Sequence, residues 1–138
     1  PAFVAWCQKH GYPVEIVSDG LELYVKILLA RYNLDIPYRS NRITMTEHGA
    51  VMEFPYHADD CGKCGNCKRQ RVLEVKRDPL VKVVYIGDGI SDECPAEHAD
   101  ILLAKGHLAQ YCREHRIEHI PFANFGDILR LLPELIRL

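Results

Sequence analysis

The sequence predicts an α/β protein with a Rossmann-like, doubly wound parallel sheet, and three observations lead to this fold class. Strand patterns occur three times: residues 13–17 alternate, and residues 83–87 and 101–104 are short apolar runs. Segments with apolar residues at helical spacing alternate with these runs. Polar turns that contain glycine separate the two kinds of segment. Alternating strands and helices form parallel sheets with helices on both faces.

The first part of the chain predicts a helix, a strand and a second helix. Residues 3–10 have an apolar helical face, and Gly11 is a natural helix end. Residues 13–17 alternate as a short strand, and the polar turn at residues 18–20 follows it. Residues 21–32 again carry apolar side chains at helical spacing, so we expect a helix packed on the sheet.

The middle of the chain has a different sequence pattern. In residues 41–54, apolar and polar side chains alternate on both sides of a glycine, and this pattern predicts a β-hairpin that extends beyond the main sheet. A polar, cysteine-rich loop covers residues 57–67, and residues 68–76 predict a helix. No linker or repeat divides the sequence, so we expect one domain over residues 1–138 with the hairpin as an insertion in it.

The last part returns to strands and helices. Residues 83–87 predict a buried strand that ends at Gly87-Asp88-Gly89. The elements expected after it are a short helix at residues 95–99, a strand at residues 101–104, a helix at residues 107–116, a short strand at residues 119–122 and an amphipathic helix at residues 125–137, broken at Pro133.

Composition excludes several classes of protein. The chain has 17 lysine and arginine residues against 19 aspartate and glutamate residues, so it carries no basic footprint for nucleic acid. No apolar run approaches the roughly 20 residues of a membrane span, and no segment resembles a signal peptide. We therefore expect a cytoplasmic protein with neither a nucleic-acid partner nor a membrane partner.

Four side chains at strand ends and helix starts form a set that can handle a phosphoryl group. Ser18 follows one strand, Lys68 begins a helix, and Asp88 and Asp92 lie four residues apart after another strand. A hydroxyl beside backbone N–H groups and a lysine can bind phosphoryl oxygens, and two carboxylates can hold Mg²⁺. Ligands collect at the carboxyl ends of parallel strands, so this order predicts a phosphate and metal site.

This set resembles the motifs of the haloacid dehalogenase superfamily of phosphohydrolases, and the resemblance covers essentially the whole chain. The phosphoserine-phosphatase-like branch is the most similar, in particular the enol-phosphate phosphatases of methionine salvage. The stretches that carry this resemblance are Ile16-Val17-Ser18-Asp19-Gly20, Cys64-Gly65-Asn66-Cys67-Lys68 and Tyr85-Ile86-Gly87-Asp88-Gly89.

The resemblance implies a role for each matching residue. Ser18 would hydrogen-bond the phosphoryl group with the backbone of Asp19 and Gly20 beside it, and Lys68 would stabilise charge on the phosphoryl oxygens and on the nucleophile. Two acids would hold the cofactor Mg²⁺: Asp88 directly, and Asp92 through water or by orienting the other ligands.

One departure from the family pattern stands out. These enzymes attack phosphorus with the first aspartate of an amino-terminal Asp-x-Asp motif on the central strand, and this chain has no such motif. The adjacent pair Asp59 and Asp60 has the wrong order and place. We therefore expect the chain to be the carboxyl-terminal portion of a haloacid dehalogenase-like core that lacks its first strand, and to be inactive alone. The amino-terminal segment of the same protein, or another chain, would complete the sheet.

The cysteine-rich loop supports a separate hypothesis. Its residues His57, Cys61, Cys64 and Cys67 offer an imidazole and three thiolates of the kind that Zn²⁺ binds. The alternative is that the thiols are free and make the neighbouring Lys68 site sensitive to oxidation.

The main functional prediction is a Mg²⁺-dependent phosphomonoester hydrolase that acts on a small phosphorylated metabolite through an aspartyl-phosphate intermediate. Two alternatives stay open from the sequence. The chain could be a catalytically inactive module that binds phosphate or metal, or an interaction domain that zinc stabilises.

Overall fold

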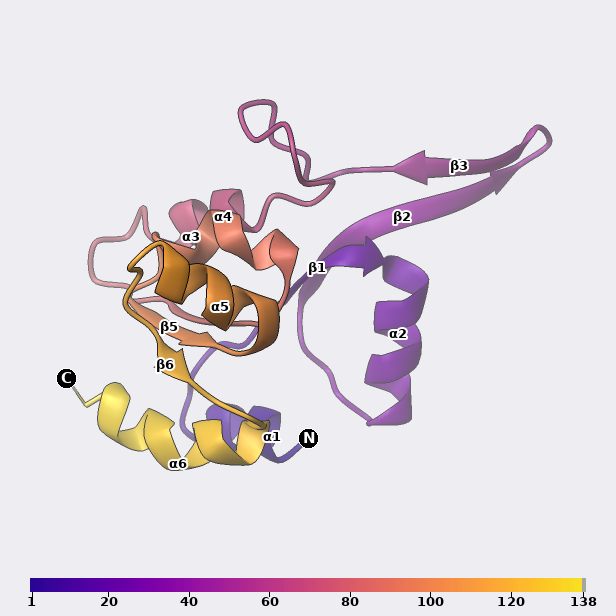
Figure 1. Ribbon diagram of the computed structural model, residues 1–138. Coiled ribbons are helices and arrows are strands. Elements are labelled where there is room, and N and C mark those ends of the chain that lie inside the picture. Colours follow the sequence, from indigo (N-terminus) through magenta and orange to yellow (C-terminus); the bar gives the residue numbers. More distant parts are fainter. Residues whose placement is uncertain (138) are drawn as a thin grey trace. The chain divides into compact units, whose positions relative to one another are not determined.

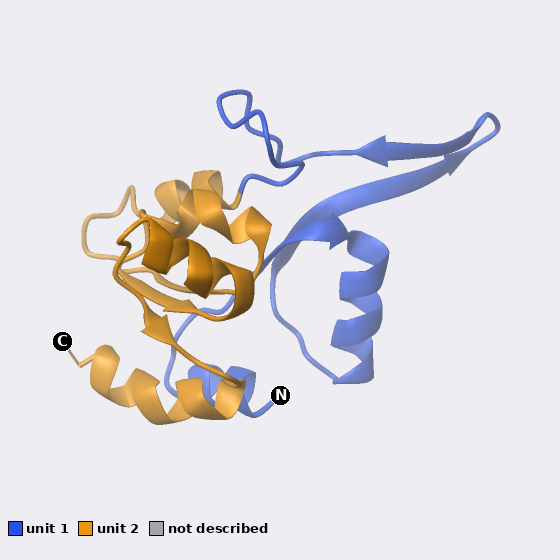
Figure 2. Ribbon diagram, viewed as in Figure 1, with its two compact units in different colours: residues 1–67 blue, residues 68–138 orange. Residues whose placement is uncertain are grey.

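The computed structural model describes residues 1–137 and has a mixed α/β architecture (Figure 1). The chain forms two compact units, Pro1–Cys67 and Lys68–Leu138 (Figure 2). Parallel strand pairing with intervening helices occurs in both units. The predicted Rossmann-like α/β fold class is therefore confirmed.

The first unit is built around a three-stranded sheet with the strand order β1-β2-β3. Its elements are α1 (Ala2–Lys9), β1 (Ile16–Leu21), α2 (Glu22–Arg31), β2 (Tyr38–Thr46) and β3 (Gly49–Glu53). The first half of β2 pairs with β1 in parallel, and the second half pairs with β3 antiparallel. One strand thus belongs both to the parallel sheet and to the hairpin that extends from it (Figure 1).

Strand β1 is longer than the sequence pattern indicates. The pairing register shifts between Val17 and Leu21, and Leu21 still pairs with Asn41 of β2. The polar turn that the sequence places after the strand therefore lies inside an irregular part of it. Apolar alternation alone could not show this, because backbone pairing continues through polar residues.

The core of the first unit lies between its two helices and its parallel strands. The buried side chains come from α1, α2 and the segment before β2, and they are Val4, Val25, Leu29 and Ile36. Val25 and Leu29 are four residues apart, so they lie on the same face of α2. Ile16 and Tyr38, which pair across β1 and β2, pack against this cluster.

The second unit contains a three-stranded parallel sheet with the order β4-β5-β6. Its elements are α3 (Lys68–Val75), β4 (Val84–Gly87), a 3₁₀ turn (Ile90–Asp92), α4 (Glu93–Ala96), β5 (Ile101–Ala104), α5 (Gly106–Glu114), β6 (Ile120–Pro121) and α6 (Phe125–Leu135). Strand β5 lies in the middle, and its residues Leu103 and Ala104 are fully buried.

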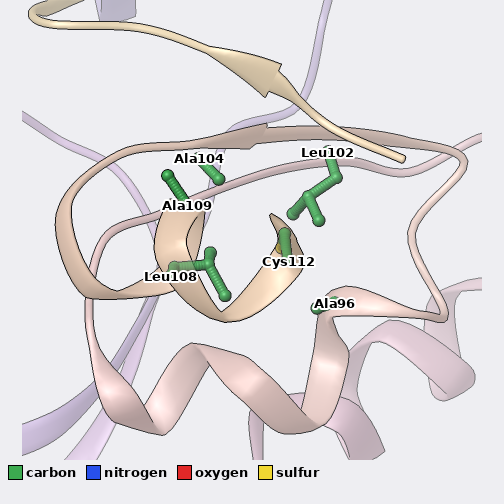
Figure 3. Packing of buried hydrophobic residues seen from close by; sticks show 6 residues of the cluster. All are labelled: Ala96, Leu102, Ala104, Leu108, Ala109 and Cys112. Carbon is green, nitrogen blue, oxygen red and sulfur yellow. The ribbon is translucent and has the colours of Figure 1, made fainter. Parts of the chain in front are cut away.

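The core of this unit joins β5 to α5 and α4. Leu108 and Cys112 are four residues apart on α5 and are fully buried against Leu102, Ala104 and Ala96 (Figure 3). Small alanine side chains let the helix pack closely on the strand. The close packing fixes the position of α5 relative to the carboxyl end of β5.

Helix α6 continues through Pro133 as far as Leu135, so the break expected at this proline does not occur. Pro133 lies in the last turn, where a missing N–H removes one hydrogen bond near the helix end. Ile128 and Leu132 of the same helix are buried and hold it in place. None of the helices in the described chain has the length and apolar character that a membrane crossing requires.

Candidate active site

The carboxylate of Asp92 is the centre of a hydrogen-bonded group in the second unit. It lies in the 3₁₀ turn after β4 and is 5% exposed. Oδ1 accepts hydrogen bonds from Lys68 Nζ at 2.7 Å and from the Tyr85 hydroxyl at 2.5 Å. Oδ2 accepts from the backbone N–H groups of Asp88 and Gly89, both at 3.0 Å. Four donors therefore surround one buried anion.

These donors decide the charge state of Asp92. Burial alone would raise the pKa of this carboxyl, but the hydrogen bond and charge of Lys68 outweigh it, with smaller contributions from Tyr85 and the N–H of Gly89. The pKa of Asp92 is therefore held below its ordinary value. Asp92 is an anion at neutral pH.

Lys68 is the first residue of α3, and its side chain is buried. Besides Asp92, its ammonium donates to the hydroxyl of Ser91 at 2.9 Å. The adjacent residues Ser91 and Asp92 thus present two acceptors to one lysine. Helix α3 and the turn after β4 are joined by these contacts, which fix the lysine at the carboxyl end of β4.

Two glycines allow the backbone to approach closely at this strand end. A Cβ on Gly87 would lie 2.7–2.9 Å from Asp92 side-chain atoms, so only glycine leaves room for this carboxylate. Gly106 has a φ of 55° and begins α5 against the carbonyl of Asp88. Asp88 itself has an exposed side chain. Its backbone is held by its own N–H to Asp92 and by the N–H of Leu108, which donates to its carbonyl at 3.3 Å.

The turn at Ser18 belongs to the first unit. The hydroxyl oxygen of Ser18 accepts a hydrogen bond from the N–H of Gly20 at 3.0 Å, which closes a tight turn. The Asp19 carboxylate accepts from the N–H of Asn66 at 2.9 Å and from the side chain of Asn41 at 3.1 Å. The turn is therefore held from both the loop before α3 and strand β2.

Asn41 and Asn66 are functional candidates that the sequence pattern missed. Asn41 is 2% exposed and Asn66 is fully buried. An asparagine in a loop or strand has no periodic signal, and its partners here lie 22 to 48 residues away in the sequence. The one available signal was the position of Asn66 inside the stretch of residues 64–68 that carries the family resemblance.

Of the four side chains predicted for the site, Lys68 and Asp92 are in direct contact, and the backbone of Asp88 joins them. Ser18 belongs to the other compact unit, together with Asp19 and Gly20. The convergence of Ser18 on the acids and the lysine stays a prediction, as do the catalytic and metal-binding roles of all of these residues.

The cysteine loop gathers thiols in the first unit. The Sγ atoms of Cys61 and Cys64 lie within 4.8 Å of one another. Hydrogen bonding from the Lys63 N–H lowers the pKa of Cys61 to about 7 against the opposing effect of burial, with help from Cys64 and Cys67. Cys61 therefore has substantial thiolate character at neutral pH.

The other predicted zinc ligands lie in the same loop. Cys67 is 2% exposed, and the ring Nδ1 of His57 forms a hydrogen bond with the carbonyl oxygen of Cys64 at 3.2 Å. The Nε2 atom of His57 lies 3.9 Å from a carboxylate oxygen of Asp59. Thiolates and an imidazole fit Zn²⁺ in their donor chemistry, and their use as a four-ligand set stays a prediction.

The fold and these contacts define a class of protein: a Rossmann-like α/β protein with a buried acid and lysine pair at the carboxyl end of a parallel strand. The family model described as "Putative Phosphatase" matches residues 2–111, and the chain belongs to this family of haloacid dehalogenase-like phosphatases. The resemblance noted from the sequence is confirmed.

Curated relatives agree with this assignment. The chain is 32% identical over 140 residues to the 2-hydroxy-3-keto-5-methylthiopentenyl-1-phosphate phosphatase of Lysinibacillus sphaericus, covering 97% of this chain and 61% of the relative. It is 34% identical over 137 residues to the protein of the same name from Geobacillus kaustophilus, covering 96% and 61%. It is 32% identical to the bifunctional enzyme MtnB/MtnX of Bacillus licheniformis, covering 96% and 31%. The chain thus spans about three fifths of the first two relatives.

Proposed function

We propose that the native protein is a Mg²⁺-dependent phosphomonoester hydrolase of a small phosphorylated metabolite. The observation that carries the proposal is the buried Asp92 carboxylate, which holds Lys68 at 2.7 Å at the end of β4 in a chain of a phosphatase family. Charge stabilisation and positioning supply most of the catalysis in phosphoryl transfer, and these are the roles that an anchored lysine can perform.

The turn at Ser18 supplies the proposed phosphoryl-binding groups. The Ser18 oxygen already accepts from the N–H of Gly20, so its own O–H can donate to a phosphoryl oxygen. Lys68 would add a positive charge that Asp92 keeps in a fixed position. A pre-oriented cation contributes more than a mobile one, because no reorganisation is needed during the reaction.

The acids after β4 fit Mg²⁺ in their chemistry, since this ion prefers carboxylate oxygens and retained water. The exposed carboxylate of Asp88 would be the direct ligand. Asp92, whose two oxygens accept from four donors, would act through water or by orienting the other groups. The ion, when bound, would neutralise charge on the phosphoryl oxygens.

The nucleophile is proposed to come from outside these 138 residues, because the sequence contains no Asp-x-Asp. The family resemblance supports an aspartate that forms an aspartyl-phosphate intermediate. Within residues 1–137, β1 pairs with β2 and β4 pairs with β5, so each has a second edge to which another strand could bind. An amino-terminal segment of the same protein, or another chain, would supply both the strand and the nucleophile.

The names of the relatives support a substrate class. Several are named phosphatases of 2-hydroxy-3-keto-5-methylthiopentenyl-1-phosphate, and we propose that the native protein acts on this compound or a similar enol phosphate.

Removal of the Asp88 charge tests the proposed function. In the full-length native protein, Asp88→Asn should lower Mg²⁺-dependent phosphate release from an aryl phosphate by about 10²-fold or more, because a charge-stabilising group is lost. Glu97→Gln, which neutralises another exposed acid of the same unit, is the control and should leave the rate unchanged. Wild-type turnover in Asp88→Asn would contradict the proposal, and a folded wild-type protein that binds phosphate without turnover would support the inactive-module alternative.

A zinc-stabilised loop is a second candidate, favoured by the short distance between the Cys61 and Cys64 sulfur atoms and by the low pKa of Cys61. Metal analysis of the purified protein should then show one zinc ion per chain, and Cys61→Ser should lose it. Iodoacetamide should label Cys61 only after a chelator is added. Rapid labelling near pH 7 without a chelator, in protein free of zinc, would retire this candidate.

A further inference from the structure

Asn66 is fully buried and connects the Ser18 turn to strand β2 through hydrogen bonds. Its side-chain Nδ2 donates to the carbonyl oxygen of Ser18 at 2.8 Å and to that of Arg39 at 3.0 Å. Its backbone N–H donates to the Asp19 carboxylate at 2.9 Å. Carbonyl oxygens cannot donate, so the amide must present its NH₂ group to them, and both of its hydrogens are used.

The three acceptors belong to two strands of the first unit. Ser18 and Asp19 lie in the irregular part of β1, and Arg39 lies in β2. The donor, Asn66, lies in the loop before α3. One fully buried side chain therefore joins the phosphoryl-binding turn to the neighbouring strand. Register irregularity between Val17 and Leu21 leaves the turn without regular ladder bonds, so the amide supplies what the sheet does not.

Asn41 supports the same turn from the other side. Its Nδ2 donates to the Asp19 carbonyl at 2.9 Å and to the Asp19 carboxylate at 3.1 Å. Asp19 is thereby held by two asparagines, and the N–H of Gly20 stays directed at the Ser18 hydroxyl oxygen. Each contact restrains an atom within one residue of Ser18.

We infer that Asn66 is a positioning residue for phosphoryl transfer: it holds the Ser18 carbonyl and the Asp19 carboxylate so that the Ser18 O–H and the nearby N–H groups are pre-oriented toward the phosphoryl oxygens. The inference rests on the proposed function. Asn66 is fully buried and acts through the turn, without contact to the substrate. Its removal should therefore lower the rate through loss of orientation.

The test compares Asn66→Ala with a variant that costs stability elsewhere in the same unit. Val4→Ala removes a buried apolar contact in a core cluster that does not include Ser18, Asp19 or Gly20. Both variants are made in the full-length native protein and assayed well below their melting temperatures. Misplacement of a reacting group by about 1 Å lowers rates by roughly 10²-fold, and kcat/KM of Asn66→Ala should fall by about that factor. Val4→Ala should keep the wild-type value.

A second measurement reports on the turn directly. Amide hydrogen exchange of the peptide that contains Gly20 should speed up in Asn66→Ala and stay as in wild type in Val4→Ala. The milder variant Asn66→Ser, which keeps one donor, should give intermediate values in both assays and serves if the alanine variant does not fold. The affinity for inorganic phosphate should fall in the same order.

The outcomes separate this inference from the proposed function. If wild type hydrolyses phosphomonoesters and the two asparagine variants lose no more activity than Val4→Ala, the inference is wrong and the function stands. If folded wild type shows no phosphatase activity, the proposed function fails. Exchange at Gly20 then still decides whether Asn66 holds the turn.

Discussion

At the residue scale, Gly87 and Asp92 occupy adjoining space at the end of β4. A Cβ on Gly87 would lie 2.7 Å from Asp92 Cγ, closer than real Cβ contacts. The glycine is therefore required by the buried carboxylate beside it, and the carboxylate in turn holds Lys68. The absence of a Cβ at Gly87 leaves the space in which the Asp92 carboxylate meets Lys68.

We expect Gly87→Ala to lower the free energy of unfolding by about 1–3 kcal/mol, since the new methyl group overpacks the site. The same change should reduce phosphatase activity of the full-length protein, because Asp92 and Lys68 must move. Urea unfolding and a kinetic assay check the two effects.

Gly89→Ala is the matched control for this experiment. Its Cβ would lie 3.8 Å from Asp92 Oδ2, which is an ordinary contact, and its φ of −115° suits any residue. Equal losses in the two variants would show that the close approach at Gly87 does not decide the geometry.

The sequence indicated part of this site and missed another part for a physical reason. Lys68 and Asp92 stand out because an acidic turn after an apolar run and a lysine at a helix start have local signals. Asn41, Asn66 and Tyr85 have no such turn or helix-start signal, because their hydrogen bonds depend on the path of the folded chain. Tyr85 in particular belongs to the strand pattern, and its hydroxyl contact with Asp92 could not be foreseen from alternation.

At the element scale, helix α6 shows how local chemistry sets where an element begins. Asn124 accepts hydrogen bonds from the N–H groups of Gly126 at 2.8 Å and Asp127 at 3.2 Å. The Asp127 carboxylate accepts from the N–H of Ala123 at 2.9 Å and from that of Asn124 at 3.2 Å. Asn124 and Asp127 form a reciprocal capping box that pairs backbone donors at the helix start.

Asn124→Ala should lower the free energy of unfolding by about 0.5–2 kcal/mol, because the cap loses its acceptor. Asn124→Ser keeps an acceptor oxygen and should stay close to wild type. Urea unfolding measures both variants. An alanine variant as stable as wild type would mean that the buried face of α6 alone fixes its first turn.

The elements themselves were predictable to different degrees. The runs in β4 and β5 are short and apolar, and the structure places strands at Val84–Gly87 and Ile101–Ala104, close to the predicted ranges. Strand β1 extends four residues past its predicted end at Val17, and α6 passes through Pro133. Both differences arise because tertiary pairing and burial override the local preference of polar residues and of proline.

At the scale of the whole molecule, several carboxyl groups link stability to pH. Asp92, Asp100 and Asp127 all have lowered pKa values. For Asp92, burial raises the pKa, but the pairing with Lys68 lowers it by more. The largest cause is the hydrogen bond from the N–H of Val83 for Asp100 and from the N–H of Ala123 for Asp127. Each group binds protons less readily in the folded chain than in the unfolded chain.

The stabilising contribution of these groups is complete above the unfolded pKa of about 3.9 and is lost as pH falls through the lower folded values. We therefore expect the free energy of unfolding to decrease below about pH 4. Asp92→Asn should show a shallower decrease, because its share of the proton uptake is gone. Urea unfolding at a series of pH values checks this, and an identical pH dependence in the variant would contradict it.

The alternation of strands and helices was sufficient to predict the α/β class, because it reflects burial averaged over many residues. The division at Cys67 and Lys68 into two compact units has no counterpart in composition. It depends on which strands pair, and within the described residues β1 and β4 pair with β2 and β5 respectively. Strand partners are a long-range property that a single sequence does not reveal.

The double use of β2 has a consequence for how the protein can vary. Its first half pairs with β1, and Ser40 and Asn41 in this half are buried. A shift of the pairing by one residue would move each side chain to the opposite face of the sheet, so these two residues would lose their present surroundings. Its second half and all of β3 are exposed. The outer ribbon can therefore lengthen, shorten or exchange its side chains at small cost, while the inner half of the same strand must stay unchanged.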